Sequence, residues 1–343
     1  MAEQHAKERL AEWVHEVTGR SGFALEALAG GASPRRFSRV RWTEGGSAVL
    51  MQVPPETPDR AFADERGRVW PFLEIRVLLE SRGVRVPRLL AEDCAHGLLL
   101  VEDLGETLAE RLERRPEQRA ALYRRATLDL AAAQQRLAPL PAGSVVLERA
   151  FDAALLGWEL EHFWEWGVVA RGRSSAGRAG FEAGARFLVD AIAALPRGFV
   201  HRDYQSRNLL VRGDGPELEL GWVDFQDALL GPRTYDLVAL LCDSYQPFER
   251  PEVEARLDEY ARARGLSGEE RALLGREFDL ITVQRKLKDA GRFVFIERKR
   301  GDSSFLPFVK PTLAIVASAL ERLRGVPELA SLRELVAGEL AAA

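Results

Sequence analysis

The sequence predicts an α+β protein in two parts, an N-terminal antiparallel sheet followed by a larger and mainly helical C-terminal part. Short strand-like runs between Gly-rich turns fill the chain up to about residue 105, whereas long helical periodicity dominates from residue 108. The chain has 343 residues, 46% of them hydrophobic and 29% charged, so it is long enough for two domains or two lobes. We therefore expect the first part at 1–105 and the second at 106–343.

The N-terminal part begins with an amphipathic helix at 3–17, in which Leu10, Trp13 and Val14 lie on one stripe. Strand-like runs separated by turns follow, and the first three predict an antiparallel meander. A helix and two more strands complete this part. The expected strands are 23–28, 37–42, 47–53, 88–91 and 98–101, and the expected helix is 72–80.

Three long segments of the C-terminal part have helical periodicity. The first, 116–137, repeats apolar residues every three or four positions. The second, 151–169, is rich in Trp and Phe, and such a segment more often packs into a core than serves as a sugar platform. The third, 269–300, is predicted to be one long helix with an irregularity at Gly291.

Composition argues against several classes of function. A net charge of −4 gives no reason to expect nucleic acid or a membrane surface as a partner. Cys94 and Cys242 lack metal-ligand spacing and predict neither a disulfide framework nor a zinc site. The charged N-terminus and the lack of an apolar run of ~20 residues predict a cytoplasmic protein. We expect a small-molecule ligand and no obligatory protein partner.

Two polar motifs follow strand-like runs near the middle of the chain. The segment 200–211 reads H-x-D-x-x-x-x-N between two apolar runs and contains His201, Asp203 and Asn208. A Gly-rich turn and another short strand then lead to Asp224, which is followed by Phe. We expect these elements to form a hairpin with the three acidic and amide groups at one end. A surface hairpin with ordinary polar residues is the alternative.

These groups suit phosphoryl transfer from ATP. Moving a γ-phosphoryl group requires little covalent chemistry and much positioning of charge. A carboxylate such as Asp203 can orient and deprotonate an acceptor hydroxyl. The Asn208 amide oxygen and the Asp224 carboxylate are hard ligands of the kind that Mg²⁺ prefers.

On these motifs and on the segment 231–241, the chain resembles the aminoglycoside phosphotransferase family, the small-molecule relatives of protein kinases, over nearly its whole length. Within this family it resembles most the kinases that phosphorylate the anomeric hydroxyl of N-acetylmuramate and N-acetylglucosamine in cell-wall sugar recycling. That narrower resemblance rests on 201–208, 224–228 and 284–288. The resemblance implies a protein-kinase-like two-lobed fold, ATP and Mg²⁺ in its cleft, and a small sugar or alcohol as acceptor.

The resemblance also implies roles for further residues. His201 would buttress the catalytic loop, and Asp236 would tie the following helix to that loop. Ser33 lies where the family places the loop that covers the phosphates, although a plain hairpin turn would look the same. Glu102 and Leu104 lie at the hinge whose backbone binds adenine, where the alternative is an ordinary strand edge.

One feature of the family is missing, because the strand at 47–53 has no lysine for the α- and β-phosphates. An arginine fork can bind phosphate, so Arg35, Arg36 or Arg39 could replace that lysine, and we select Arg36. An inactive nucleotide-binding scaffold is the other explanation. Glu74, which would pair with the lysine in a usual kinase, is then expected to be solvated or paired with an arginine.

Four residues are candidates for binding the acceptor. Glu159 lies on the aromatic-rich helix, and Asp227 either faces the acceptor or caps a turn. Arg285 and Lys288 share one face of the long helix, in a stretch (276–300) with eight basic and four acidic residues. A solvated charged face is the alternative.

The excess of basic residues bears on the identity of the acceptor. A basic face suits an anionic sugar better than a polycationic aminoglycoside. We therefore expect a sugar 1-phosphate as the product, with aminoglycoside, choline or homoserine phosphorylation as the alternatives. A protein kinase is least expected, because Gln226 replaces the Gly of D-F-G.

Overall fold

The computed structural model describes residues 2–28, 34–173, 175–244, 246 and 248–341. The chain forms two compact units. The N-terminal unit consists of Met1–Thr107 and Leu209–Asp227, and the C-terminal unit consists of Leu108–Asn208 and Ala228–Ala343. The first boundary lies close to the expected one at residue 105. The segment Leu209–Asp227 differs from the expectation, because its strands pair with the end of the N-terminal segment.

A five-stranded antiparallel sheet forms the centre of the N-terminal unit, in the order β1-β2-β3-β5-β4. The first three strands form the predicted meander. Ala48 and Leu50 of β3 and Leu100 of β5 are wholly buried in one core cluster. Met51 and Leu99, on the opposite face of these strands, are buried as well, so the central strands of the sheet are covered on both faces. The strands are β1 (Phe23–Ala27), β2 (Arg36–Trp42), β3 (Ser47–Gln52), β4 (Leu89–Asp93) and β5 (Leu98–Glu102).

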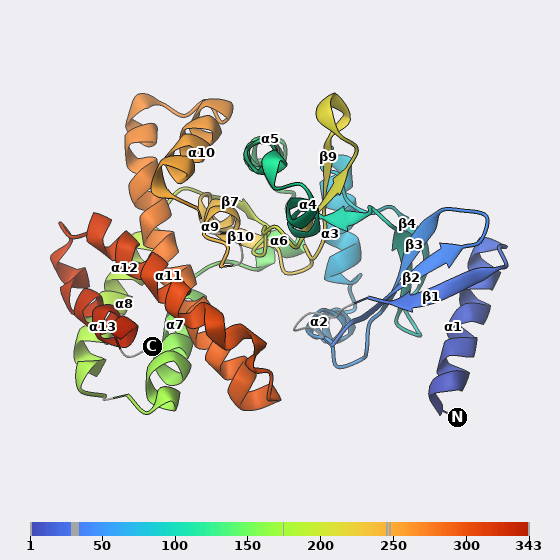
Figure 1. The fold of residues 1–343 in the computed structure, drawn as a ribbon, viewed down its shortest axis with the longest axis horizontal. Helices are drawn as coiled ribbons and strands as arrows, with labels where there is room; N and C mark the ends of the chain where they lie inside the picture. Colours follow the sequence, from blue (N-terminus) through green and yellow to red (C-terminus); the bar gives the residue numbers. More distant parts are fainter. Residues whose placement is uncertain (1, 29–33, 174, 245, 247, 342–343) are drawn as a thin grey trace. The chain divides into compact units, whose positions relative to one another are not determined.

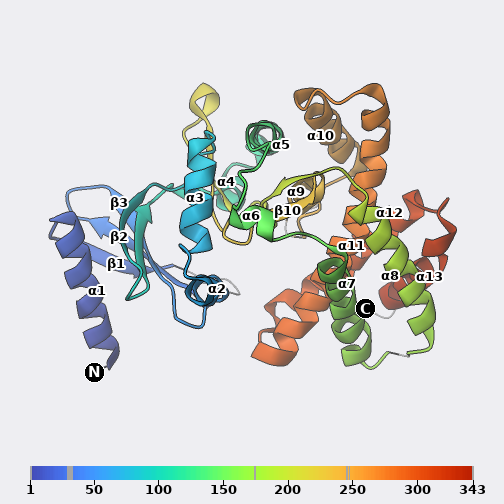
Figure 2. The ribbon, with the colours of Figure 1, turned by 180° about the vertical axis from the view of Figure 1, so that it is seen from behind.

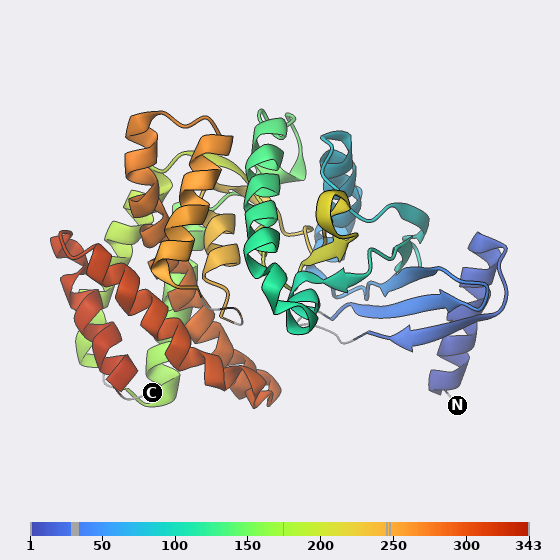
Figure 3. The same ribbon diagram turned by 45° about the horizontal axis from the view of Figure 1, so that its top comes forward.

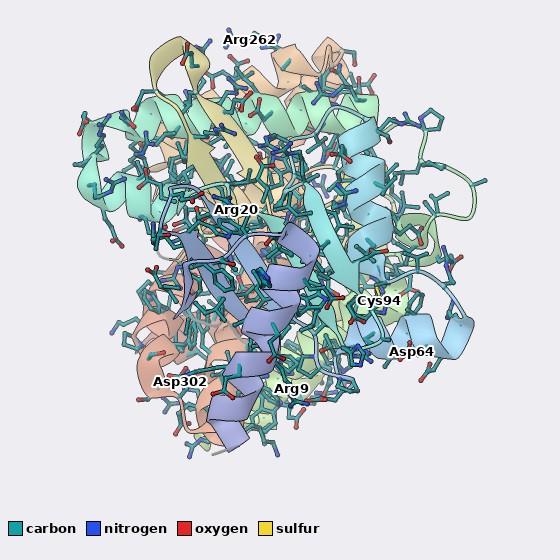
Figure 4. The ribbon with its side chains drawn as sticks, turned by 90° about the vertical axis from the view of Figure 1, so that its right-hand side faces the viewer. Arg9, Arg20, Asp64, Cys94, Arg262 and Asp302 are labelled. Carbon is teal, nitrogen blue, oxygen red and sulfur yellow. The ribbon has the colours of Figure 1, made fainter. Side chains whose placement is uncertain are left out.

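Helix α1 (Ala2–Thr18) covers one face of this sheet (Figure 4). Its Val14 is wholly buried in one cluster with Trp42 of the sheet, and Trp13 packs against the same cluster. Arg20, labelled in Figure 4, follows the helix and lies over the Trp42 ring, 4.3 Å from its centroid. The apolar stripe predicted for this helix therefore packs onto the sheet.

A smaller sheet in the N-terminal unit has the order β6-β8-β9. Figures 1 and 2 show helix α3 beside its β8–β9 hairpin. Phe72 of α3 stacks on Phe225, which follows β9, with 5.1 Å between the ring centroids. These elements are α2 (Pro58–Arg66), α3 (Pro71–Ser81), β6 (Glu106–Thr107), β8 (Leu209–Arg212) and β9 (Glu219–Trp222).

The C-terminal unit is mainly helical, and α10 packs against both α5 and α11 (Figure 3). A two-stranded antiparallel sheet joins β7 (Arg197–Val200) to β10 (Leu229–Pro232). The predicted segment 151–169 is helical but changes to a π-helical turn at Phe163–Val168. The α-helices are α4 (Leu108–Arg114), α5 (Arg119–Arg136), α6 (Val145–Glu148), α7 (Ala153–His162), α8 (Arg178–Ala193), α9 (Tyr235–Leu241), α10 (Arg250–Ala263), α11 (Gly268–Arg300), α12 (Val309–Arg322) and α13 (Ala330–Ala341).

The strands around the catalytic motif correct the expected hairpin. β7, which precedes Asp203, pairs with β10, whereas β8, which follows Asn208, pairs with β6 and β9. Only the β8–β9 part of the expected hairpin is present in the described chain. The pairing of β7 with β10 joins apolar runs far apart in sequence, and local periodicity carries no information about such a partner.

Helix α11 is continuous through Gly291, so the irregularity expected there is wrong. Gly291 instead allows close packing against the end of α7. A Cβ atom on this residue would lie 2.7 Å from Phe163 Cα and 3.0 Å from the His162 carbonyl oxygen. Backbone atoms cannot give way as a flexible side chain can, so only glycine permits this approach.

We expect Gly291→Ala to destabilise the protein by about 1–3 kcal/mol and to lower its Tm by several degrees. Gly275→Ala on the same helix is the matched control, because its new Cβ would meet nothing nearer than an Arg250 nitrogen at 3.8 Å. That control should be neutral or stabilising by up to about 1 kcal/mol through helix propensity. Thermal unfolding of both variants tests this, and equal Tm values would contradict the packing assignment.

One helical stretch of the described chain, Ser303–Arg322, is long and apolar enough to cross a membrane by length and composition. It contains Pro307 at a 3₁₀ turn, and the α12 part packs against α11 with Leu313, Val316 and Leu320 buried. We interpret it as a helix that packs on α11 through one buried face.

Candidate active site

The catalytic loop in the C-terminal unit is held by the buried carboxylate of Asp236. Its two oxygens accept hydrogen bonds from the backbone N–H groups of His201 (2.7 Å) and Arg202 (3.0 Å). Burial raises the pKa of Asp236 to about 7, and the two backbone hydrogen bonds act in the opposite direction. The predicted tie between α9 and the loop is thus present, and it fixes the backbone just before Asp203.

Arg285 of α11 reaches the same loop from the other direction. Its guanidinium donates to the Arg202 carbonyl oxygen (2.7 Å) and to Asp203 Oδ1 (3.3 Å), and it lies over the Tyr235 ring at 4.8 Å. Burial acts to raise the pKa of Asp203, but the charges of Arg285, Lys288 and Arg202 outweigh it and lower that pKa. Asp203 is therefore an oriented carboxylate at neutral pH.

Arg202 adopts a backbone conformation that side chains rarely take, with φ of 82°. Such strain is characteristic of functional sites and persists only where neighbours hold it. Here the neighbours are Asp236 on the Arg202 amide and Arg285 on the Arg202 carbonyl. The strain turns the chain between His201 and Asp203.

Hydrogen bonds within the loop fix Asn208. Its side-chain Nδ2 donates to the Asp203 carbonyl oxygen at 2.8 Å. Because only the nitrogen of the amide can donate, this hydrogen bond fixes the orientation of the side-chain amide. Ser206, between them, donates to Asp243 at 2.6 Å. His201 is wholly buried and packs edge-on against Tyr204, as expected for a buttress.

The basic segment of α11 is buried around residue 285, so the solvated-face alternative is wrong there. Gln284 Nε2 donates to Glu159 (2.8 Å), and Lys286 Nζ donates to Ser244 (2.7 Å) and Asp289 (3.0 Å). Lys288 forms an ion pair with Asp289 at 2.9 Å. Each of these polar side chains therefore has a partner inside the C-terminal unit.

Glu159, predicted as a substrate contact, is wholly buried in this network. One carboxylate oxygen accepts from Gln284 (2.8 Å), and the other lies 3.4 Å from Arg202 Nη2. These contacts make it a support for Arg202 rather than a residue exposed to a ligand.

Asp224 lies in the N-terminal unit directly after β9. It is the other described non-glycine residue with positive φ, at 63°. Gln226 Nε2 donates to Asp224 Oδ1 (2.8 Å) and to Asp227 (3.3 Å), and Arg35 Nη1 lies 3.9 Å from Asp224 Oδ1. The side chain of Asp224 is 45% exposed, so this oriented carboxylate is accessible to solvent.

The register of the β8–β9 hairpin relates Asp224 to the end of the catalytic loop. Leu209 lies opposite Trp222, Asn208 is bonded to Leu209, and Asp224 follows Trp222 by two residues. In the chain, Asn208 therefore directly precedes β8 and Asp224 closely follows β9.

The residues that we expected to bind the nucleotide, Glu102, Leu104 and Ser33, do not share one environment. Glu102 ends β5, and its carboxylate binds Arg85 (2.6 Å) and Arg88 (3.2 Å), so that its pKa falls to about 2. Leu104 is buried against Gly221. Ser33 lies outside the described residues.

The three arginines near the predicted phosphate loop, Arg35, Arg36 and Arg39, lie in different environments. Arg36 is exposed, Arg39 forms an ion pair with Asp103 at 2.7 Å, and Arg35 is buried beside Asp224. Glu74 pairs with Arg68 at 3.0 Å, which confirms the expected arginine partner.

Sequence reasoning missed several supporting residues. Gln226, noted only as a departure from D-F-G, orients Asp224, and Arg202 links the loop to Glu159. Arg285, predicted to bind substrate, donates hydrogen bonds to Arg202 and Asp203 of the catalytic loop. The signal for this supporting role was that Gln284 and Arg285 are adjacent on a helix that is buried, because a buried charged side chain needs partners.

Comparison with known proteins identifies the protein family to which this chain belongs. A model described as "Phosphotransferase enzyme family" matches residues 24–274. This is more than half of the chain, which therefore belongs to the phosphotransferase enzyme family and is an enzyme that acts as a kinase.

Two individual proteins are similar to this chain over nearly its whole length. The chain is 35% identical over 326 residues to the N-acetylmuramate/N-acetylglucosamine kinase of Pseudomonas putida, covering 92% of this chain and 88% of the relative. It is 30% identical over 341 residues to the protein of that name from Neisseria meningitidis serogroup B, covering 96% of each.

Solved structures share the fold at low sequence identity. The GDP complex of an aminoglycoside 2'-phosphotransferase-IIIa mutant aligns with a TM-score of 0.62 at 14% identity, over 93% of this chain and 99% of that one. A choline kinase from Streptococcus pneumoniae aligns with a TM-score of 0.57 at 14% identity, over 92% and 99%. The predicted kinase-like fold is confirmed.

Proposed function

We propose that this enzyme transfers the γ-phosphoryl group of ATP to the anomeric hydroxyl of N-acetylmuramate or N-acetylglucosamine and forms the sugar 1-phosphate in the cytoplasm. The single observation that carries the proposal is the Asp203 carboxylate, ionised and oriented by Arg285, in a chain so similar over its length to kinases of that name. A hemiacetal hydroxyl is more acidic than a simple alcohol, which suits a carboxylate with a low pKa.

In this proposal Asp203 accepts the acceptor hydroxyl proton and aligns its oxygen with the phosphoryl group. Asn208 and Asp224 supply the oxygen ligands for Mg²⁺, which would neutralise phosphate charge when bound. The residues fit a hard cation, since Asp224 offers a half-exposed carboxylate and Asn208 an amide with a fixed orientation. Backbone groups near Glu102 and Leu104 are the proposed adenine contacts. Ser33 is the residue of the phosphate-covering loop that we propose to contact the phosphates.

The direct test is a panel of acceptors with Mg-ATP and purified enzyme. The panel contains N-acetylmuramate, N-acetylglucosamine, an aminoglycoside, choline and homoserine, and phosphorus NMR locates the new phosphate. We expect an anomeric phosphate on the two amino sugars. Phosphorylation of another acceptor alone, or of a sugar hydroxyl other than the anomeric one, would reject the proposal.

The phosphate-binding arginine can be identified by comparing neighbours. Arg35 is buried beside Asp224 whereas Arg36 is exposed, so the surroundings favour Arg35 for the place of the missing lysine. We expect Arg35→Met to raise the KM for ATP about tenfold or more and Arg36→Met to change it less than threefold. The reverse order would restore our sequence-based selection of Arg36.

A further inference from the structure

A cation without an acidic partner lies on α11 two turns beyond Arg285. Three basic residues near the catalytic loop have acidic partners: Arg285 with Asp203, Arg202 with Glu159, and Lys288 with Asp289. Within the described chain, Arg292 makes no ion pair with a carboxylate. It is half-buried, and its guanidinium lies 4.6 Å from the centroid of the Phe295 ring, which restricts its orientation.

The surroundings of Arg292 are electropositive. Burial lowers the pKa of Arg292, and the charges of Arg300 and Arg202 lower it further. Burial also lowers the pKa of His162 to about 4, with contributions from Arg292 and Lys288. A half-buried guanidinium in such a field is stabilised by an anion.

His162 provides a second, independent sign of a polar ligand. It is 7% exposed, and its Nε2 atom has no hydrogen-bond partner in the described part of the chain. Its ring stacks on that of Trp158 at 5.6 Å and lies 5.3 Å from that of Phe295, on which Arg292 rests. A buried polar atom of this kind is normally satisfied.

Gly291 explains how these groups come together. The contact of Gly291 with His162 and Phe163 brings α11 directly against the end of α7, and Figures 1 and 2 show these two helices side by side. Arg292 is the next residue of α11. Arg285 and Arg292 are seven residues apart on one helix, which is two turns or about 10 Å. A sugar ring with a short carboxylate arm can span that interval from Asp203.

We propose that Arg292 binds the carboxylate of an acidic amino sugar and thereby sets the preference of the enzyme between acidic and neutral acceptors. This inference rests on the proposed function, because it assigns the acceptor site of that reaction. The expected ligand class is an N-acetylated amino sugar with one carboxylate, with the ring beside His162 and Trp158. Lys288, whose charge Asp289 compensates, is then not the principal contact.

The test measures KM and kcat of Arg292→Gln for N-acetylmuramate and for N-acetylglucosamine. A charge-assisted hydrogen bond is worth about 1.5–3 kcal/mol, so we expect the KM for the acidic sugar to rise about 10- to 100-fold. The KM for the neutral sugar and both kcat values should stay within about threefold. Turnover of the neutral sugar also shows that the variant is folded, and Arg292→Lys should recover part of the loss.

Lys299→Gln is the matched control, because this exposed cation lies near the same aromatic residues, 5.3 Å from the Trp166 ring centroid. It should leave the ratio of the two KM values unchanged. An equal change for both sugars in Arg292→Gln, or the same change in ratio for Lys299→Gln, would overturn the inference while the proposed function stands. A wild-type enzyme that phosphorylates neither sugar would overturn the proposed function and this inference with it.

Discussion

Replacing Asp203 with Asn is expected to reduce turnover at least about a thousandfold while Mg-ATP binding stays nearly unchanged. The variant keeps the shape of the side chain but removes the carboxylate that accepts the proton. The loop should keep its conformation, because its anchors are the Asp236 hydrogen bonds to the backbone and the Arg285 hydrogen bond to the Arg202 carbonyl. Single-turnover phosphorylation of the sugar and calorimetric titration with Mg-ATP measure the two effects separately.

Asp190→Asn on α8 is the control for this experiment, since Asp190 is exposed and its side chain makes no hydrogen bond or ion pair with the loop in the described part of the chain. Its turnover and Tm should match those of the wild type. If Asp203→Asn retained turnover within tenfold, Asp203 would not be the base. If it lost ATP binding to the same extent, a role in the nucleotide site would replace the role in proton transfer.

Replacing Asp224 is expected to weaken binding of Mg-ATP by at least about 100-fold and to abolish turnover. Changing residues that merely support metal ligands typically costs 10–100-fold in affinity, so loss of a direct carboxylate ligand should cost more. Calorimetric titration of ATP at several Mg²⁺ concentrations measures this. Binding of ATP without Mg²⁺ should change little.

The backbone at Asp224 requires a careful choice of substitution. Its φ is 63°, a conformation that Asn tolerates well and Ala poorly. Asp224→Asn should therefore retain the wild-type Tm while losing the metal effect, whereas Asp224→Ala should lose both. Mg²⁺-dependent binding that is equal in Asp224→Asn and the wild type would remove Asp224 from the metal site.

The sequence predicted most of the architecture of both units. The strand-like runs at 23–53 became the meander, because short apolar runs separated by Gly-rich turns directly favour antiparallel strands that are neighbours in the chain. The helical segments were equally evident, since the apolar stripe of each helix repeats locally. The partner of β7 was not predictable, because β10 lies beyond two other strands in the chain.

The candidate functional groups could be proposed from the sequence, because phosphoryl transfer constrains residue types and spacing: Asp203, Asn208 and Asp224 were predicted from that chemistry. Only the tertiary structure decided what holds and surrounds these residues. Arg285 lies 82 positions from Asp203 in the chain, and Gln284 lies 125 from Glu159, so no local pattern relates these partners. Whether a lysine or arginine on a basic helix meets an acid or remains available to an anion depends on packing, and here packing distinguishes Arg292 from Lys288.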